Sequence, residues 1–435
     1  MHYLVHYLVH YLVHYQCLDA GVRDFFENSE VEVSYGPLMM GPMLFQDDVA
    51  RLAGDLESAQ IGNDRMEAVA ETKLLDYNLK KSSYVVIAKK KERLKIENKA
   101  KEKPLLLCGK PMSQEKSVKY LGDWISQDGL AESVSITVKN RLGLTKLAIF
   151  EMKTVVEDCR SQVVGGLMTG ITIWEAAIIP RLLYNADVWM NIDKKTLKSL
   201  EDLQLLFYRV LFNVGSGCPI PILYWDTGGV LMKFRILQKK LLFIHHLATL
   251  PGESLAKEIY EIQKIFEFPG LIQDCKETLV KMQITDISRF SKMHWKKLVK
   301  KYISGANEQE LLERMKNYKK IHPAELAIEG CRAKDYLNEM DIASARLKFK
   351  LRSHMTPTVK MNFMNDELFK KQMWLCEGCA KLSYNENTMG KLDTQQHILV
   401  CEGYSDLREG KDLDKDQDLV GYFQAVIRRR MLSVI

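Results

Sequence analysis

Apolar residues recur every three or four positions from about residue 131 onward, and this spacing constrains the fold more than any other feature of the chain. The clearest stretches cover residues 133–156, 171–188 and 194–214. Spacing of this kind places the apolar side chains on one face of an α-helix. Prolines and glycines near residues 220, 229 and 251 separate further helical stretches. The pattern predicts a largely helical protein, and 435 residues are enough for two or three domains.

Residues 31–125 differ from the rest because short β-type runs surround a single helical stretch at residues 61–79. Residues 89–103 hold eight basic and three acidic residues, which indicates a solvated loop or a hairpin extension. The predicted fold class is therefore α+β and predominantly α, with a small antiparallel sheet. Strands are expected over residues 31–35, 43–52, 84–87, 105–107 and 118–125.

The N-terminus carries a repeat in which the tetrapeptide His-Tyr-Leu-Val occurs three times over residues 2–13. A signal peptide would begin with positive charge and continue with an uninterrupted apolar stretch, whereas histidine recurs here at every fourth position. A helix would align these histidines loosely, so metal binding is one interpretation. We favour a simple-sequence repeat without function and exclude residues 1–15 from the predicted fold.

No stretch of the chain has 18 or more consecutive apolar residues, so no transmembrane helix is expected. Nine cysteines without a recognisable secretory leader indicate thiols in a reducing compartment. We therefore expect a nuclear or cytoplasmic protein that is neither secreted nor associated with a membrane.

The one Asp-Asp pair of the chain, Asp47-Asp48, follows Phe45 and lies between two apolar runs. This arrangement predicts a strand–turn–strand with two carboxylates at its tip. Polymerases use such a tip because phosphoryl transfer needs oxygen ligands for two divalent ions about 3.5–4 Å apart. A solvated surface turn is the alternative.

A second pattern, Cys376-x2-Cys379-x17-His397-x3-Cys401, combines three of the cysteines with one histidine near the C-terminus. The first pair places two thiolates on one tight turn, and the second pair lies one helical turn apart. Four such ligands form the closed tetrahedral site that is typical of structural Zn²⁺. A closed site has no open position for water, so we expect no catalysis there. The long gap between the pairs also allows a chance match.

The order of motifs along the chain resembles that of the reverse transcriptases of non-LTR retrotransposons. Residues 45–48 resemble the Phe-x-Asp-Asp catalytic turn of that family. After the predicted helix, Asn78, Lys81 and Ser82 resemble its Asn-x-x-Lys-Ser/Thr element.

The later motifs follow in the same order. Lys119, Tyr120, Leu121 and Gly122 match the family's Lys-Tyr-Leu-Gly primer grip. The helical region then contains residues that resemble a Pro–Leu–Tyr–Trp pattern and a Leu-Glu-x-x-Gln helix: Pro180, Leu182, Tyr184, Trp189, Leu200, Glu201 and Gln204. The resemblance extends from about residue 38 to residue 432.

This resemblance implies a partial palm over residues 16–127, a helical thumb and connection region over residues 128–345, and a C-terminal part over residues 346–435. The C-terminal part would hold a basic segment, the Cys3His zinc knuckle and a last helix. The implied partners are RNA and DNA, and no small-molecule substrate is indicated. In the intact family Asp47 and Asp48 would bind Mg²⁺.

The chain departs from the family in one respect. Family members bind two metal ions with three carboxylates, and the first carboxylate lies on a strand well upstream of the Asp-Asp turn. Asp19 and Asp24 are the only aspartates upstream of Asp47, and their surroundings match no family motif. The sequence therefore predicts a polymerase fragment with weak or absent Mg²⁺ binding and without unaided catalysis. The alternative is a nucleic-acid- or protein-binding scaffold with a structural zinc site.

Basic residues concentrate in residues 281–363, where 18 Lys and Arg stand against 9 Asp and Glu. Such a segment could bind phosphates, and a solvated helix surface would have the same composition. Within it, four cations alternate with Leu347, Phe349 and Leu351. This period of two indicates one basic face of a strand, and the helical surroundings leave a helix as the alternative. The candidate nucleic-acid-binding residues are Arg346, Lys348, Lys350 and Arg352.

Overall fold

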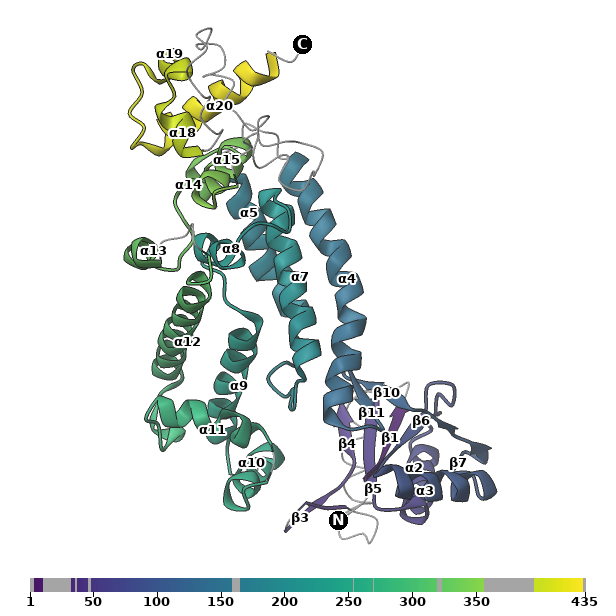
Figure 1. The fold of residues 1–435 in the computed structure, drawn as a ribbon. Coiled ribbons are helices and arrows are strands. Elements are labelled where there is room, and N and C mark those ends of the chain that lie inside the picture. Colours follow the sequence, from purple (N-terminus) through teal and green to yellow (C-terminus); the bar gives the residue numbers. More distant parts are fainter. Residues whose placement is uncertain are drawn as a thin grey trace. The chain divides into compact units, whose positions relative to one another are not determined.

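The computed structural model describes residues 4–10, 33–35, 37–45, 48–158, 165–252, 254–268, 270–318, 323–355 and 395–432. These residues are mainly helical, with a few short strands (Figure 1). The predicted α+β class with a predominance of helices is confirmed. None of the described helices is both long and apolar enough to cross a lipid bilayer.

The chain divides into two compact units, each assembled from three stretches of sequence. Unit 1 comprises Met1–Gly143, Leu183–Leu200 and Arg235–Tyr302. Unit 2 comprises Leu144–Leu182, Glu201–Phe234 and Ile303–Ile435. The continuous boundaries expected near residues 127 and 345 do not coincide with these units. Four of the five dividing lines fall inside long helices, and the fifth follows Leu182, where a helix ends. The spacing of apolar residues cannot reveal a boundary within a helix.

A five-stranded sheet forms the N-terminal part of unit 1, with the strand order β4, β5, β1, β6, β9. Neighbouring strands are antiparallel except β6 and β9, which are parallel. The strand bounds are β1 (Leu4–His10), β4 (Met43–Phe45), β5 (Asp48–Ala53), β6 (Ser83–Ile87) and β9 (Ser113–Gln114). Three further antiparallel pairs are β2 (Val33–Tyr35) with β3 (Leu38–Met40), β7 (Leu106–Leu107) with β8 (Lys110–Pro111), and β10 (Ser117–Tyr120) with β11 (Asp123–Ser126).

The N-terminal repeat supplies β1, the central strand of this sheet, so its exclusion from the predicted fold was wrong. Val9 lies opposite Val49 of β5, and Tyr7 lies opposite Tyr84 of β6. Tyr, Leu and Val favour strands, and the repeat contains neither Gly nor Pro. Pairing on both sides satisfies the backbone hydrogen-bonding groups of β1, and only the neighbouring strands provide those partners.

Two helices of unit 1 pack against the sheet, α2 (Leu56–Thr72) and α3 (Lys90–Glu102). Met66 and Val69 of α2 pack on Val49 of β5, and Ile96 of α3 packs on a cluster that includes Tyr84. The loop predicted at residues 89–103 is therefore wrong. Lys, Arg, Glu and Ala all favour helices, and the apolar contact of Ile96 gives this charged helix one buried side.

The remaining elements are helical and follow in chain order. They are α4 (Leu130–Asp158), α5 (Gly166–Ile173), the π-helix η1 (Trp174–Ile178), α6 (Ile179–Leu182), α7 (Lys194–Phe212), α8 (Ile220–Thr227), α9 (Met232–Ala248), α10 (Leu255–Ile265), α11 (Leu271–Lys281), the 3-10 helix η2 (Ile287–Arg289), α12 (Lys292–Met315), α13 (Pro323–Glu329), α14 (Tyr336–Glu339), α15 (Ile342–Arg352), α18 (Gln395–Val400), the 3-10 helix η4 (Glu402–Tyr404), α19 (Ser405–Arg408) and α20 (Asp416–Leu432).

Stacked aromatic rings hold the core of unit 2 together. Trp174 of η1 stacks on Phe207 of α7 with 4.4 Å between ring centroids, and Phe212 of α7 stacks on Phe349 of α15 at 3.9 Å. All four rings are fully buried. Burial of one phenylalanine side chain contributes roughly 1.5–3 kcal/mol, so these rings fix α7 against both η1 and α15.

Candidate functional site

Asp48 begins strand β5 and pairs with Phe45, the last residue of β4. This antiparallel pair confirms the predicted strand–turn–strand. The Asp48 side chain is partly exposed at the end of the sheet. Asp47 lies outside the described residues.

The strand beside Asp48 is β1, and His10 is the residue that pairs with Asp48 there. Asp48 carries the only carboxylate among strands β1, β4, β5 and β6. A two-metal site needs several oxygen ligands. These four strands therefore supply one of the three carboxylates that the resemblance implies.

The Lys119–Gly122 motif forms a tight hairpin between β10 and β11. Tyr120 pairs with Asp123 across a two-residue turn in which Leu121 has φ 46° and Gly122 has φ 89°. Positive φ at both central residues is the type I′ geometry that matches the twist of a hairpin. Glycine accepts this conformation without strain. The turn geometry therefore explains why glycine occupies position 122.

Two of the motifs lie near each other in unit 1, although 72 positions separate Asp48 from Tyr120. Burial raises the pKa of the Tyr120 hydroxyl, and the Asp48 carboxylate raises it further. An electrostatic influence of this kind requires proximity. Strand β10 also packs beside β6 of the sheet that contains Asp48, so the two motifs belong to one compact region of unit 1.

Arg141 of α4 joins the β10–β11 turn to the segment that contains Tyr184. Its guanidinium donates hydrogen bonds to the Tyr184 carbonyl at 2.6 Å and to the Gly122 carbonyl at 2.9 Å, and it forms an ion pair with Asp123. The same group lies 5.7 Å from the ring centroid of Tyr184 and 5.6 Å from that of Trp189. Two motifs of the resemblance therefore meet at a cation whose position carried no motif in the sequence.

The Asp123 carboxyl beside Arg141 is partly buried. Burial raises its pKa, and this effect outweighs the charge and hydrogen bond of Arg141 and the hydrogen bond of Asn185. Asn185 also donates to the Leu121 carbonyl at 3.3 Å. The turn is thus held by side chains from two separate stretches of sequence.

Asn78, Lys81 and Ser82 form the turn that leads into β6. The Asn78 carbonyl accepts hydrogen bonds from the backbone amides of Lys81 and Ser82, both at 3.0 Å, and from the Ser82 hydroxyl at 3.0 Å. Asn78 thus acts here through its backbone, and the Lys81 side chain is exposed.

Glu201 and Gln204 of α7 hold the connection between α8 and α9 in unit 2. Glu201 accepts hydrogen bonds from the Tyr224 hydroxyl at 2.8 Å and from the Met232 amide at 2.7 Å. Gln204 is fully buried and donates to the Val230 carbonyl at 3.1 Å. These motif residues therefore have a structural role in this chain.

The strand predicted for Arg346–Arg352 is wrong, because Ile342–Arg352 forms helix α15. The helix begins at Asp341, whose carboxylate accepts hydrogen bonds from the Ala343 and Ser344 amides at 2.9 and 3.0 Å. Its buried residues lie on several sides of the helix. A helix that is buried on several sides shows no 3.6-residue spacing of apolar residues in its sequence. Only the alternation of cations was then visible, and it indicated a strand.

The four cations of α15 do not share one face, and three of them bind carboxylates of the same unit. Arg346 donates to the Leu211 carbonyl at 2.9 Å and lies 3.4 Å from Glu157. Lys348 pairs with Asp416 and Arg352 pairs with Asp226. Lys350 is partly buried, and burial together with the nearby Arg346 lowers its pKa. These side chains stabilise unit 2 and are poorly placed to contact phosphates.

Half of the predicted zinc site falls within the described residues. His397 lies on α18, and Cys401 follows that helix and is buried. Arg408 donates a hydrogen bond to the Cys401 carbonyl at 2.7 Å, which fixes the backbone there. Cys376 and Cys379 lie outside the described residues. Among the residues that the structure describes, no three potential metal ligands gather, as expected when two of four are not described.

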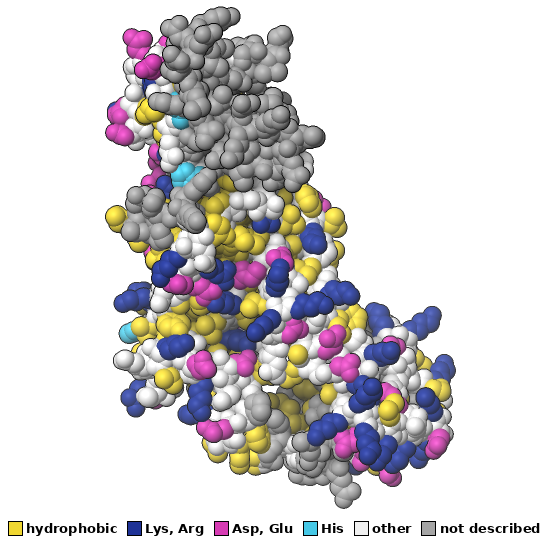
Figure 2. Space-filling view, viewed as in Figure 1, with side chains coloured by type: hydrophobic (Ala, Val, Ile, Leu, Met, Phe, Trp, Pro, Cys, Tyr) yellow, Lys and Arg dark blue, Asp and Glu magenta, His cyan; other side chains and the backbone are white. Residues whose placement is uncertain are grey.

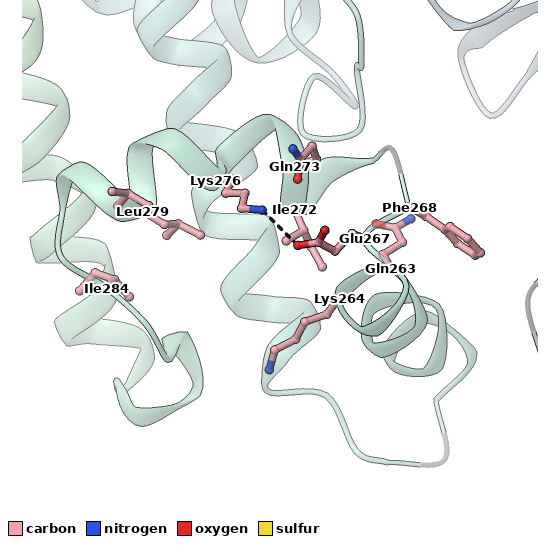
Figure 3. Close-up of a pocket in the computed structure, with 10 residues that line it drawn as sticks. Gln263, Lys264, Glu267, Phe268, Ile272, Gln273, Lys276, Leu279 and Ile284 are labelled. Carbon is pink, nitrogen blue, oxygen red and sulfur yellow. Dashed lines mark hydrogen bonds and ion pairs between the residues drawn. The ribbon is translucent and has the colours of Figure 1, made fainter.

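A separate pocket of about 230 Å³ lies between α10 and α11 in unit 1 (Figure 3). Ile272, Leu279 and Ile284 line it together with polar side chains. Lys276 and Glu267 form an ion pair across it at 3.2 Å. Its lining contains no His, Cys or Asp, so these residues offer no set of metal ligands.

Comparison of the chain with models of protein families finds no match, and a search of curated proteins finds no significant relative.

Proposed function

We propose that this chain is the C-terminal part of an RNA-directed DNA polymerase of the non-LTR retrotransposon type, that it binds nucleic acid, and that it does not extend primers by itself. The proposal starts from the order of motifs along the sequence. The Asp47-Asp48 turn, the Asn78–Ser82 turn and the Lys119–Gly122 turn occur in the order of the resemblance.

The observation that carries the proposal is that β10, the strand of Lys119 and Tyr120, packs beside β6 of the sheet that contains Asp48. In a polymerase the metal-binding carboxylates and the residues that hold the primer must act on the same primer end. The electrostatic influence of Asp48 on Tyr120 supports such an arrangement. Arg141 adds to this support, because it holds the Gly122 turn and the Tyr184 segment together.

The absence of unaided catalysis follows from the residue types beside Asp48. The neighbouring strand β1 places His10 opposite Asp48 and contains no acidic residue. Mg²⁺ prefers carboxylate oxygens and water as ligands. With one described carboxylate at this position, we expect weak or absent Mg²⁺ binding.

The single described carboxylate at Asp48 also favours a second candidate from another class, a non-enzymatic binding scaffold. In that case Cys376, Cys379, His397 and Cys401 would hold a structural Zn²⁺, and the helical units would bind nucleic acid or protein. The two candidates differ in whether Asp47 and Asp48 retain any role at a primer end.

A primer-extension assay tests the proposal. The full chain is incubated with Mg²⁺, dNTPs and a primer annealed to an RNA template, and a separate gel-shift assay uses the same primer–template. We expect binding without extension above background. Extension that Asp47→Ala abolishes would contradict the expected silence, and failure to bind any primer–template would contradict the polymerase origin.

A further inference from the structure

The basic stretch at residues 281–363 separates into two groups of cations in the structure. Three of the four cations of α15, Arg346, Lys348 and Arg352, bind carboxylates and carbonyls inside unit 2. The lysines in the first half of α12 are different, because all of them are exposed. They are Lys292, Lys296, Lys297, Lys300 and Lys301.

The lysines of α12 have no acidic neighbours along the helix, since residues 291–307 contain no Asp or Glu. None of the five forms an ion pair with another described residue. Figure 2 shows dark-blue side chains over α12, near the left edge of the view. The result is a cationic helix face without internal compensation.

This arrangement carries an electrostatic cost. Lys292 and Lys296, Lys296 and Lys300, and Lys297 and Lys301 are spaced four residues apart, and each like-charged pair destabilises a helix by roughly 0.2–0.5 kcal/mol. The helix N-terminus is the positive end of the helix dipole, so cations there are unfavourable as well. The first turn of α12 contains no acidic residue to offset this. A bound polyanion would relieve both effects.

The opposite side of α12 is anchored in unit 1, which fixes the direction of the lysine face. Trp295 is 1% exposed and donates a hydrogen bond from its indole to the Leu241 carbonyl at 2.8 Å. Its ring also stacks on His245 of α9, with 5.7 Å between centroids. The lysines therefore project from a rigid support and not from a loop.

The geometry of the face distinguishes between nucleic acids. Lys296 and Lys300 form one row and Lys297 and Lys301 another, about 100° apart around the helix. An α-helix with side chains is about 10–12 Å wide and fits the major groove of B-DNA, about 12 Å wide, where two such rows would reach phosphates of both strands. The major groove of an RNA duplex is too narrow for a helix.

A single strand is a poorer fit because its binding relies on exposed aromatic rings that stack on bases. Trp295 is buried, and Tyr302 is only partly exposed. We therefore propose that the exposed lysine face of α12 binds the phosphates of double-stranded DNA, with the helix in the major groove. This inference rests on the nucleic-acid-binding role proposed above and assigns it a surface and a ligand.

The test measures the affinity of the full chain for a fluorescein-labelled 20-base-pair DNA duplex between about 50 and 200 mM salt. The variant replaces Lys296, Lys297, Lys300 and Lys301 by Gln, which keeps helix propensity and removes four charges. Each lost phosphate contact should flatten the slope of log K against log salt by about 0.9. We expect a slope flatter by about 3 to 4 and an affinity at 100 mM salt lower by on the order of 10³-fold.

The matched control replaces four exposed lysines of α3, Lys91, Lys95, Lys99 and Lys101, by Gln. They have acidic neighbours in α3, and we expect the slope to change by less than about one unit. A Lys→Arg version of the α12 variant should bind as the wild type does, and circular dichroism checks that each variant is folded.

The outcomes separate the two proposals. If the wild type binds the duplex and the α12 Gln variant binds equally well, the inference is overturned while the proposed function stands. Equal losses in both Gln variants, equal or tighter binding of an RNA duplex, or preferential binding of phosphatidylserine vesicles would also overturn it. If the wild type binds no nucleic acid, the proposed function fails together with the inference.

Discussion

Replacing Arg352 by Met tests the network that holds α15 in unit 2. Asp226 is fully buried and accepts hydrogen bonds from Arg352 at 2.8 and 3.2 Å and from the Tyr336 hydroxyl at 2.9 Å. Arg352 also pairs with Glu329 at 2.6 Å. Burial opposes ionisation of Glu329, but hydrogen bonds from Arg352 and Lys334 and their charges lower its pKa to about 2. Arg352→Met leaves the Asp226 carboxylate buried without its counter-charge.

Two arguments give the same magnitude for this change. Removing one partner of a buried ion pair costs about 3–5 kcal/mol. The carboxyl can instead take up a proton on folding. An aspartate in an unfolded chain ionises near pH 3.9, and protonation at pH 7, about three units higher, costs about 4 kcal/mol at roughly 1.4 kcal/mol per unit. We therefore expect Arg352→Met to lower the free energy of unfolding of unit 2 by about 4 kcal/mol at pH 7.

The second argument predicts a pH dependence with a definite sign. In the variant the folded state binds one proton more than the unfolded state between about pH 4 and pH 7. The variant's stability should therefore fall as pH rises, by about 1.4 kcal/mol per unit relative to the wild type. At pH 5 the cost of the substitution should be only about 1–2 kcal/mol.

Hydrogen exchange measured in increasing urea reports this local stability through peptides that cover α8 and α15. Wild type and variant are compared at the same pH, so intrinsic exchange rates cancel. The double variant Asp226→Asn with Arg352→Met removes the charge itself and should lose the pH dependence. The reasoning is refuted if the cost of Arg352→Met is the same at pH 5 and pH 7, or if the double variant shows the same slope.

Three further predictions concern the turn, the repeat and the zinc ligands. Gly122→Ala should destabilise unit 1 by about 1–2 kcal/mol, because Gly122 has φ 89° and an added Cβ would lie 3.1 Å from the Tyr184 ring. Urea unfolding measures this cost, and Gly122→Asn should cost less. Equal costs for the two variants would contradict the prediction. Deletion of residues 2–5 should leave the hydrogen-exchange protection of β5 and β6 unchanged, because residues 8–14 have the same sequence as β1 and can take its place. Val9→Pro should reduce this protection, because proline cannot donate a backbone hydrogen bond within a central strand. One Zn²⁺ per chain should co-purify with the protein and be lost in Cys379→Ser, while the amides of α12 stay protected from hydrogen exchange. Mass spectrometry measures the bound metal. A folded wild-type sample without metal would exclude the ligand set.

Local patterns were sufficient for the elements whose surroundings are simple. The helices after residue 131 have one buried face, so the 3.6-residue spacing predicted them. The hairpin at residues 43–52 was predicted from two apolar runs around a turn. Residues 118–125 were predicted as one strand but form the β10–β11 hairpin, because the chain turns at Leu121 and Gly122. The assignments at β1, α3 and α15 failed for one reason, which is that the partner of each element decides its structure. β1 needs β5 and β6 on either side, and α15 is buried against several elements.

The candidate site shows the same division. The sequence by itself determined that Asp48 belongs to a strand–turn–strand and that Tyr120 belongs to a β-type run. Only the tertiary structure brought Asp48 near Tyr120 and placed Arg141 between Gly122 and Tyr184. No motif marks Arg141, because its partners come from stretches 19 and 43 positions away.

Charge is the clearest example of what only the tertiary structure decides. The sequence determined that residues 281–363 are strongly basic, but composition cannot tell a paired cation from a free one. Arg352 finds Asp226 at a separation of 126 residues, and this carboxylate neutralises it inside the protein. Lys296 and Lys300 are exposed on α12 and form no ion pair with a described residue. The physical reason is that Coulomb interactions depend on distance in space and on burial, and neither is a property of position along the chain.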